Sequence, residues 1–343
     1  MTQTPLIQIC CRIKELCKRA GIKKYSSKYS NRIFDNYQHI TLEVLREKFG
    51  CGDKAFIDEE LIELPHIVEY LGLETIPHPD TLRKFRGRIK QTILELVLLQ
   101  TTARTGIKKL VLGQDGTGFK SRKISHYYVF RLAYFERKNR KKKKRGRTPK
   151  KRRIKKYIYV QIMVELRTQM PIGVHISRKP GDDYNKFEPV AKKVIKLGKT
   201  IKLVVLDKGY DAEHVHEFIM DVLGAKSIIP ARNENVAIHR TSGRYRKEMK
   251  RGYSKKEYHQ RSKNETVNSV VKRKWGDGTL ALNWRIQNKE IIFRLILYAA
   301  RRFTSIFLLF FFRKIISPLR AEETYLFSVG GFPMSLLPVI FIY

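Results

Sequence analysis

Two aspartates follow strongly apolar segments in a part of the chain that is poor in acidic residues. Asp115 follows Lys109–Gln114 (KLVLGQ), and Asp207 follows Ile201–Leu206 (IKLVVL). Both segments are expected to be strands, and a glycine close behind each aspartate leaves room for a ligand near the backbone. Carboxylates at adjacent strand ends can share hard divalent cations through their oxygens. Either aspartate alone could instead cap the helix that follows it.

Four polar residues farther along the chain are spaced to share one face of a helix, which is expected over residues 254–274. They are Tyr258, Arg261, Glu265 and Lys272. At 100° per residue they fall on one stripe about 60° wide, and Val267, Val270 and Val271 lie on the other side. A single glutamate on a basic helix is usually a salt-bridge partner. A carboxylate flanked by two cations and a phenol, after two strand-end aspartates, favours a functional site.

The elements that must position these residues alternate between strands and helices after residue 105. Further strands are expected at 155–166, 170–177 and 226–230, and helices at 185–197 and 211–223. The first strands are in hairpin order and the later ones alternate with helices. This order predicts a mixed sheet covered by helices, which is an α/β fold.

Residues 1–105 are expected to be helical. Apolar residues recur with a period near 3.6 over 57–73, which predicts one helix there. Asp80 could cap a second helix with a basic face, which carries Arg83, Arg86, Arg88 and Lys90. Such a helix pair could enter a DNA groove, or it could be a packing domain with a charged outer face.

The chain carries 71 Lys and Arg against 32 Asp and Glu, a formal charge of +39. That excess requires a polyanionic partner, disfavours an ordinary metabolic enzyme, and points to nucleic acid rather than to an anionic membrane. Fifteen of the basic residues lie in one segment, residues 137–156, which contains no acid. We expect this basic arm to be extended and to contact DNA phosphates, mainly through Lys141, Lys142, Lys143, Lys144, Arg145, Arg152 and Arg153. A solvated linker or a localisation patch is the alternative.

Cysteine usage and hydropathy set further limits. The four cysteines all lie within the first 51 residues without a CxxC pair, which favours free thiols in a reducing cytosol. The longest uncharged run near the apolar segment 291–312 is Phe303–Phe312, which is too short to span a bilayer. We therefore expect no membrane association. The uncharged tail, Thr324–Tyr343, is expected to pack on the protein or to be a non-native extension of the reading frame.

The sequence resembles the DDE transposases of prokaryotic insertion sequences of the IS4/IS5 type. The Y-x2-R-x3-E-x6-K signature at Tyr258, Arg261, Glu265 and Lys272 is the specific part of the match. Supporting matches are Asp115–Gly118 (DGTG), Pro180–Asp183 (PGDD), Leu206–Asp211 (LDKGYD) and Ile229–Asn233 (IPARN). The resemblance runs from about residue 106 to residue 302.

This resemblance implies an RNase H-like mixed β-sheet flanked by helices and preceded by a small all-α domain. It implies that Asp115, Asp207 and Glu265 are the catalytic and metal-binding triad, and that Tyr258, Arg261 and Lys272 lie near the phosphates of the transposon end. The expected cofactor is Mg²⁺, as two ions with Mn²⁺ as a substitute and no small-molecule cofactor. The expected partners are double-stranded DNA, at transposon ends and target, and a second copy of the chain in a homodimer.

The expected activity is hydrolysis of DNA strands at the terminal inverted repeats, followed by joining of the 3′-OH ends to target DNA, in a prokaryotic cytoplasm at the nucleoid. Two alternatives stay open: an inactive or truncated transposase that only binds DNA, and a non-transposing RNase H-like nuclease. The expected domains are 1–105 (DNA-binding), 106–312 (catalytic, with the arm) and 313–343 (a tail).

Overall fold

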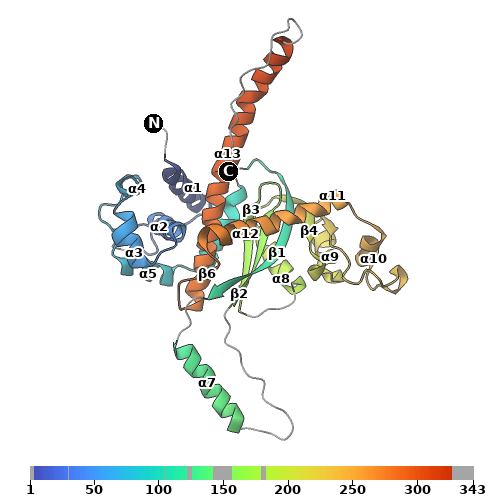
Figure 1. Ribbon diagram of the computed structural model, residues 1–343, viewed down its shortest axis with the longest axis horizontal. Helices are drawn as coiled ribbons and strands as arrows, with labels where there is room; N and C mark the ends of the chain where they lie inside the picture. Colours follow the sequence, from blue (N-terminus) through green and yellow to red (C-terminus); the bar gives the residue numbers. More distant parts are fainter. Residues whose placement is uncertain are drawn as a thin grey trace. The chain divides into compact units, whose positions relative to one another are not determined.

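A mixed sheet of six strands organises the chain in the computed structural model, which describes residues 4–29, 31–103, 105–121, 126–141, 157–178 and 183–326 (Figure 1). The strands are β1 (Lys109–Ser121), β2 (Tyr157–Glu165), β3 (Met170–Ser177), β4 (Thr200–Leu206), β5 (Lys226–Ile228) and β6 (Gly278–Thr279). Their order is β3-β2-β1-β4-β5, and β6 pairs with the end of β1. The first three strands are antiparallel, whereas β4 and β5 run parallel to β1. The predicted α/β fold class, a mixed sheet flanked by helices and preceded by a helical region, is confirmed.

Strand β1 is longer than the sequence pattern predicted, and this changes the setting of Asp115. The strand was expected to end at Gln114, but it continues to Ser121 because residues 115–120 keep pairing with β2. Pairing with β4 stops at Gln114. Asp115 therefore lies inside β1, at the first position where β4 no longer accompanies it.

Alternate residues of β1 face different helices. On one face, Gly113 abuts Asn264 and Asp115 meets Asn268, both from α12 (Ser262–Trp275). On the other face, the side chain of Gln114 reaches the backbone of Lys186 in α8 (Tyr184–Ile195). Helix α12 thus lies along the strand that carries Asp115 (Figure 1). The valine side of α12 is buried as predicted, with Val267 and Val271 fully inside the core.

Apart from α7 (His126–Lys141), α8 and α12, the helices after the sheet begins are short, except for the last. They are α9 (Glu213–Glu217), continued by a π-helical turn over Phe218–Val222, then α10 (Arg244–Arg251), α11 (Lys255–Tyr258) and α13 (Trp284–Leu326). A 3₁₀ turn, His259–Arg261, separates α11 from α12. The single helix predicted over 254–274 is therefore wrong, although the i,i+4 relation between Arg261 and Glu265 survives.

Apart from the 3₁₀ turn Gln100–Thr102, seven helical segments precede the sheet among the residues that the structure describes there. They are α1 (Pro5–Arg19), α2 (Asn36–Phe49), α3 (Asp53–Ala55) with its π-helical continuation (Phe56–Leu61), α4 (Pro65–Leu71), α5 (Pro79–Arg88) and α6 (Gln91–Leu99). The one helix predicted over 57–73 is broken at Pro65, whose ring cannot continue a helix but suits its first turn. The side chain of His78, not that of Asp80, caps α5.

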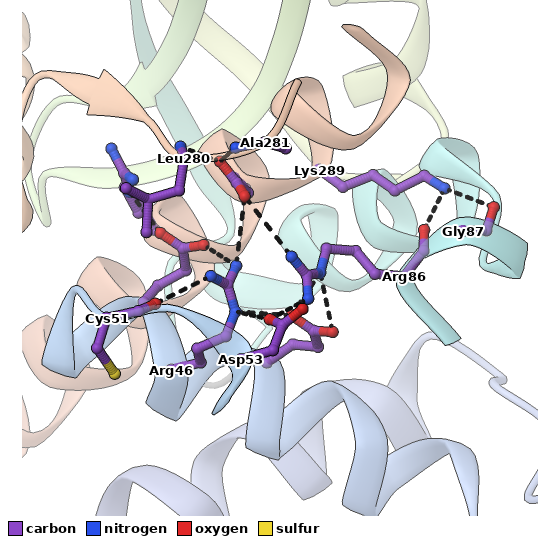
Figure 2. Close-up of polar contacts among 12 residues, drawn as sticks. Arg46, Cys51, Asp53, Arg86, Gly87, Leu280, Ala281 and Lys289 are labelled. Atoms are coloured by element: carbon purple, nitrogen blue, oxygen red, sulfur yellow. Dashed lines mark hydrogen bonds and ion pairs between the residues drawn. The ribbon is translucent and has the colours of Figure 1, made fainter. Parts of the chain in front are cut away.

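Arg86 corrects the prediction of a basic outer face on α5, because its side chain is buried. Its guanidinium pairs with Glu43 at 3.0 Å, with Asp53, and with Glu290 of α13 at 3.7 Å (Figure 2). Arg46 joins the same cluster, with Glu47 at 2.5 Å and Glu290 at 3.6 Å. Buried charges are stable only when they are paired in this way.

This buried ion cluster ties the N-terminal helices to the sheet. Glu290 Oε2 accepts hydrogen bonds from the backbone N–H groups of Leu280, at 2.9 Å, and Ala281, directly after β6 (Figure 2). Arg294 pairs with Glu47 at 2.7 Å. Apolar side chains of α1, α2 and α6 also share one core with β2, α12 and α13.

Contacts divide the chain into two compact units, Met1–Arg302 and Phe303–Tyr343. The second unit is helical as far as Leu326. The predicted boundaries at 105/106 and 312/313 remain proposals about domain organisation. None of the helices described in the structure is both long enough and apolar enough to cross a bilayer. All four cysteines are free thiols, as predicted.

The start of the basic arm is helical and not extended, because α7 runs over His126–Lys141. Arginine and lysine are good helix formers, and aromatic residues precede them here. The other arm residues expected to contact DNA lie outside the described residues. They are Lys142, Lys143, Lys144, Arg145, Arg152 and Arg153.

Arg46→Ala is expected to lower the free energy of unfolding by about 3–5 kcal/mol, because it leaves several buried carboxylates without their cation. Urea unfolding followed by circular dichroism measures this. Arg83→Ala is the control, since it removes only an exposed pair with Asp80 and should cost no more than about 1 kcal/mol. Equal losses from the two variants would contradict the stabilising role of the cluster.

Candidate active site

The parallel pairing of β1 and β4 brings Asp115 and Asp207 next to each other. Gln114 is paired with Leu206 across the two strands, and each aspartate is the next residue along its own strand. Asp207 begins the 3₁₀ turn Lys208–Tyr210, and its carboxylate accepts a hydrogen bond from the Lys208 N–H at 2.8 Å. The predicted juxtaposition of the two aspartates is therefore present in the fold.

Glu265, on the first turn of α12, is connected to Asp207 through Arg261. The Nη1 atom of Arg261 lies 2.9 Å from Glu265 Oε1 and 3.8 Å from Asp207 Oδ2. Burial by itself disfavours the charged guanidinium, but Asp207, Tyr258 and Glu265 outweigh it and raise the pKa of Arg261. A permanent cation thus stands between two carboxylates, with the third nearby.

Asp115 lies partly buried within β1, where the positive charge of Arg261 favours its ionised form. Burial raises its pKa, and the negative charge of Glu265 raises it further. Two donors oppose this effect: the Gly116 N–H at 2.9 Å and Asn268 Nδ2 at 3.0 Å. The carboxylate is therefore in a place where additional positive charge would be favourable.

The donor set fits a hard divalent cation. All three acids offer oxygen ligands, which Mg²⁺ and Mn²⁺ prefer. The buried Oδ1 atoms of Asn264 and Asn268 have no hydrogen-bond partner among the described residues. Among the residues that the structure describes, no three His, Cys, Asp or Glu side chains lie close enough together to hold a metal ion. Two of the three acids, Asp207 and Glu265, contact the cation Arg261 in this structure.

The other residues of the predicted stripe take different positions. The Tyr258 ring lies edge-on to Tyr253, with centroids 5.5 Å apart, and burial raises its pKa. The Arg261 guanidinium lies 5.9 Å from the centre of the Tyr258 ring. Lys272 is farther along α12, with Nζ 5.4 Å from the centre of the Phe119 ring. Burial lowers the pKa of Lys272, although Asp277 and Asp115 oppose this.

A buried polar network beneath the aspartates was missed by the sequence analysis. Tyr210 donates its hydroxyl to Gln161 Oε1 at 2.5 Å, and Gln161 Nε2 donates to Asp183 Oδ1 at 2.6 Å. Gln114 Nε2 reaches the Tyr210 oxygen at 3.4 Å. The network connects the β1 residue before Asp115 to the turn after Asp207, so it positions both aspartates.

Two more features of the site have a weak sequence signal. A Cβ at Gly113 would come 2.3 Å from Asn264 Nδ2, so only glycine lets α12 approach β1 this closely. Asn264 and Asn268 are buried polar residues beside Glu265 and one turn after it. Their sequence signal is polarity at positions that face the sheet. Trp275 is a core residue, at 7% exposure.

Tyr210→Phe is expected to lower the free energy of unfolding by about 1–3 kcal/mol, because the buried Gln161 oxygen loses its donor. Thermal and urea unfolding measure the loss. Tyr245→Phe, which removes an exposed hydroxyl that donates to Asp221, should have a smaller effect. A Tyr210→Phe variant as stable as the parent chain would show that the network does not hold the site.

Comparison with known proteins shows which family the chain matches. The sequence model of the transposase DDE domain matches residues 108–301, more than half of the chain. Among solved structures, the chain is similar to a piggyBac transposase synaptic complex with hairpin DNA, at 11% identity and a TM-score of 0.42, over 85% of this chain and 71% of that one. No curated protein matches significantly. The chain belongs to the transposase DDE domain family.

Proposed function

We propose that this protein is a metal-dependent transposase of the IS4/IS5 type, acting in a prokaryotic cytoplasm at the nucleoid. It binds the terminal inverted repeats of an insertion sequence, hydrolyses DNA strands there and joins the 3′-OH ends to target DNA. The observation that carries the proposal is the convergence of Asp115, Asp207 and Glu265 around one cationic side chain. A homodimer in the DNA complex follows from the need to bring two ends together.

Asp115, Asp207 and Glu265 would hold two Mg²⁺ ions, with Mn²⁺ as a substitute. When bound, such ions activate a hydroxyl nucleophile and stabilise charge on the phosphorus and on the leaving oxygen. The acids contribute oxygen ligands from three elements: a strand, a strand end and a helix. Asn268 and the Gly116 N–H keep the Asp115 carboxylate oriented through the hydrogen bonds described above.

The basic residues of the site bind and orient the DNA backbone. Arg261 has a planar guanidinium that suits bidentate contact with a phosphate, and Lys272 offers a point charge two turns farther along α12 than Glu265. The Tyr258 ring supports the Arg261 side chain from one side. The basic arm at 137–156 would add contacts to phosphates without reading sequence.

Asp115→Asn, Asp207→Asn and Glu265→Gln are each expected to abolish Mg²⁺-dependent strand cleavage while DNA affinity is retained. Each change removes a charged metal ligand and preserves the size of the side chain. Cleavage is measured on duplexes that carry the element's ends, and affinity by anisotropy. Near-full cleavage by any of the three variants would refute the triad.

The same assays distinguish the alternative functions. Cleavage by the parent chain without joining of the 3′-OH would identify a non-transposing nuclease. DNA binding by the parent chain without cleavage would identify an inactive transposase.

Arg261→Ala is expected to raise the affinity for Mn²⁺ severalfold, because it removes the cation that already neutralises Asp207 and Glu265. Strand cleavage should fall in the same variant, because a phosphate contact is lost. Isothermal titration measures the metal affinity. Lys256→Ala, an exposed cation on α11, is the matched control and should change neither quantity. Unchanged Mn²⁺ affinity in Arg261→Ala would show that the arginine does not compete for the carboxylates.

A further inference from the structure

A small basic helix outside the catalytic stripe is held against the site by acidic residues. Helix α10 (Arg244–Arg251) lies in the segment between β5 and α11, and it packs against α9 (Figure 1). From Arg232 to Lys256 this segment contains nine basic residues and two acidic ones. The described side chains from 232 to 240 are all exposed. So large a local excess of positive charge needs an explanation.

Acidic residues near the Asp207 turn anchor one side of the helix. Arg246 forms two bonds with the Asp211 carboxylate, at 2.7 and 2.8 Å. Glu213 accepts hydrogen bonds from the first free backbone N–H groups of α10, those of Tyr245 at 2.9 Å and Arg246 at 3.2 Å. The Tyr245 hydroxyl donates to Asp221 at 2.5 Å. These contacts fix the rotation of α10 about its own axis.

The anchoring also requires a special backbone. Gly243, just before α10, has a φ of +93°, and a Cβ there would lie 2.0 Å from a Glu213 oxygen. Only glycine allows this approach. The Arg232 N–H donates to Asp211 at 2.8 Å, and its guanidinium donates to the Gly209 carbonyl at 3.0 Å. The segment is therefore tied to the turn that begins at Asp207.

The opposite side of α10 presents unneutralised charge. At 100° per residue, the anchored Tyr245 and Arg246 define one side, and Arg244, Lys247 and Arg251 fall together on the other. Arg244 lies over the Tyr245 ring, 5.5 Å from its centre, and its one carboxylate contact among the described residues is the long, exposed one with Glu248, at 3.7 Å. In the part of the chain that the structure describes, Lys247 and Arg251 have no carboxylate within 4.0 Å. A fixed row of cations, with Arg244 and Arg251 exposed and Lys247 half-buried, is complementary to a phosphate backbone.

We propose that Arg244, Lys247 and Arg251 form a DNA phosphate-binding surface that the Asp211–Arg246 pair connects rigidly to the Asp207 turn. The surface holds the DNA flank at a fixed position relative to the triad, without reading bases. This assignment rests on the proposed transposase function.

The test is the salt dependence of binding to a short fluorescein-labelled DNA duplex of arbitrary sequence, followed by anisotropy in EDTA. The triple variant Arg244→Gln, Lys247→Gln, Arg251→Gln should reduce the slope of log affinity against log salt by about 2–3, since each lost phosphate contact removes about 0.9. A control triple variant, Lys192→Gln, Lys196→Gln, Lys202→Gln, removes the same charge from α8, from the residue directly after it and from the start of β4. It should leave the slope unchanged.

The outcomes separate this proposal from the proposed function. Equal slopes for the parent chain and the α10 triple variant would overturn the surface and leave the triad test untouched, because the assay contains no divalent ion. Equal reductions in both triple variants would also overturn it, because net charge alone would then explain binding. Arg246→Gln keeps the outward cations but removes the anchor, so it should weaken cleavage more than it changes the slope. An unaltered cleavage rate would contradict the rigid connection.

Discussion

Asp115, Asp207 and Glu265 place negative charge in one region of the fold, and the need to stabilise that charge is the constraint on which the rest of the structure depends. Arg261 meets that constraint in this structure by lying between Asp207 and Glu265. The burial of Asp115 adds to this constraint. Burial raises the pKa of a carboxyl group unless positive charge or hydrogen-bond donors stabilise its ionised form. Carboxylates that need a cation nearby are suited to bind metal ions, and the cation Arg261 is suited to bind a phosphate.

Rigid elements keep the acids from separating. The β1–β4 register fixes the two aspartates, and the close approach of α12 to Gly113 fixes Glu265 over the same strand. The Gln161 network fastens the strand and the turn beneath them. Farther away, the buried cluster around Arg46 and Glu290 joins the N-terminal helices to the residues after β6. Displacement of any one of these elements would move a carboxylate.

Much of the fold could be predicted from the sequence because its strands have strong apolar patterns. The hairpin over 157–177, β4 and the helix after Asp183 were predicted close to their observed ends. The continuation of β1 past Asp115 was not, because DGTG is typical of a turn and only pairing with β2 extends the strand. The break at His259–Arg261 was missed for a similar reason, since periodicity does not distinguish a 3₁₀ turn from a helix.

The residues of the site, like the elements of the fold, were predicted in part and missed in part. Asp207 and Glu265 both contact Arg261, and the β1–β4 register places Asp115 next to Asp207, whereas the assignment of the three acids as a triad stays a prediction. Arg86 was misplaced on an outer face, since only tertiary contacts show that it pairs with Glu43 inside the protein. Gln161 and Tyr210 were missed because nothing in their local sequence distinguishes a buried hydrogen bond from ordinary core packing.

Anomalous diffraction from crystals soaked in Mn²⁺ tests the central claim most directly. The account predicts anomalous density bounded by Asp115, Asp207 and Glu265, with the Arg261 guanidinium displaced from its place between the carboxylates. Density at another site, or an Arg261 that still bridges Asp207 and Glu265 in saturating Mn²⁺, would contradict it.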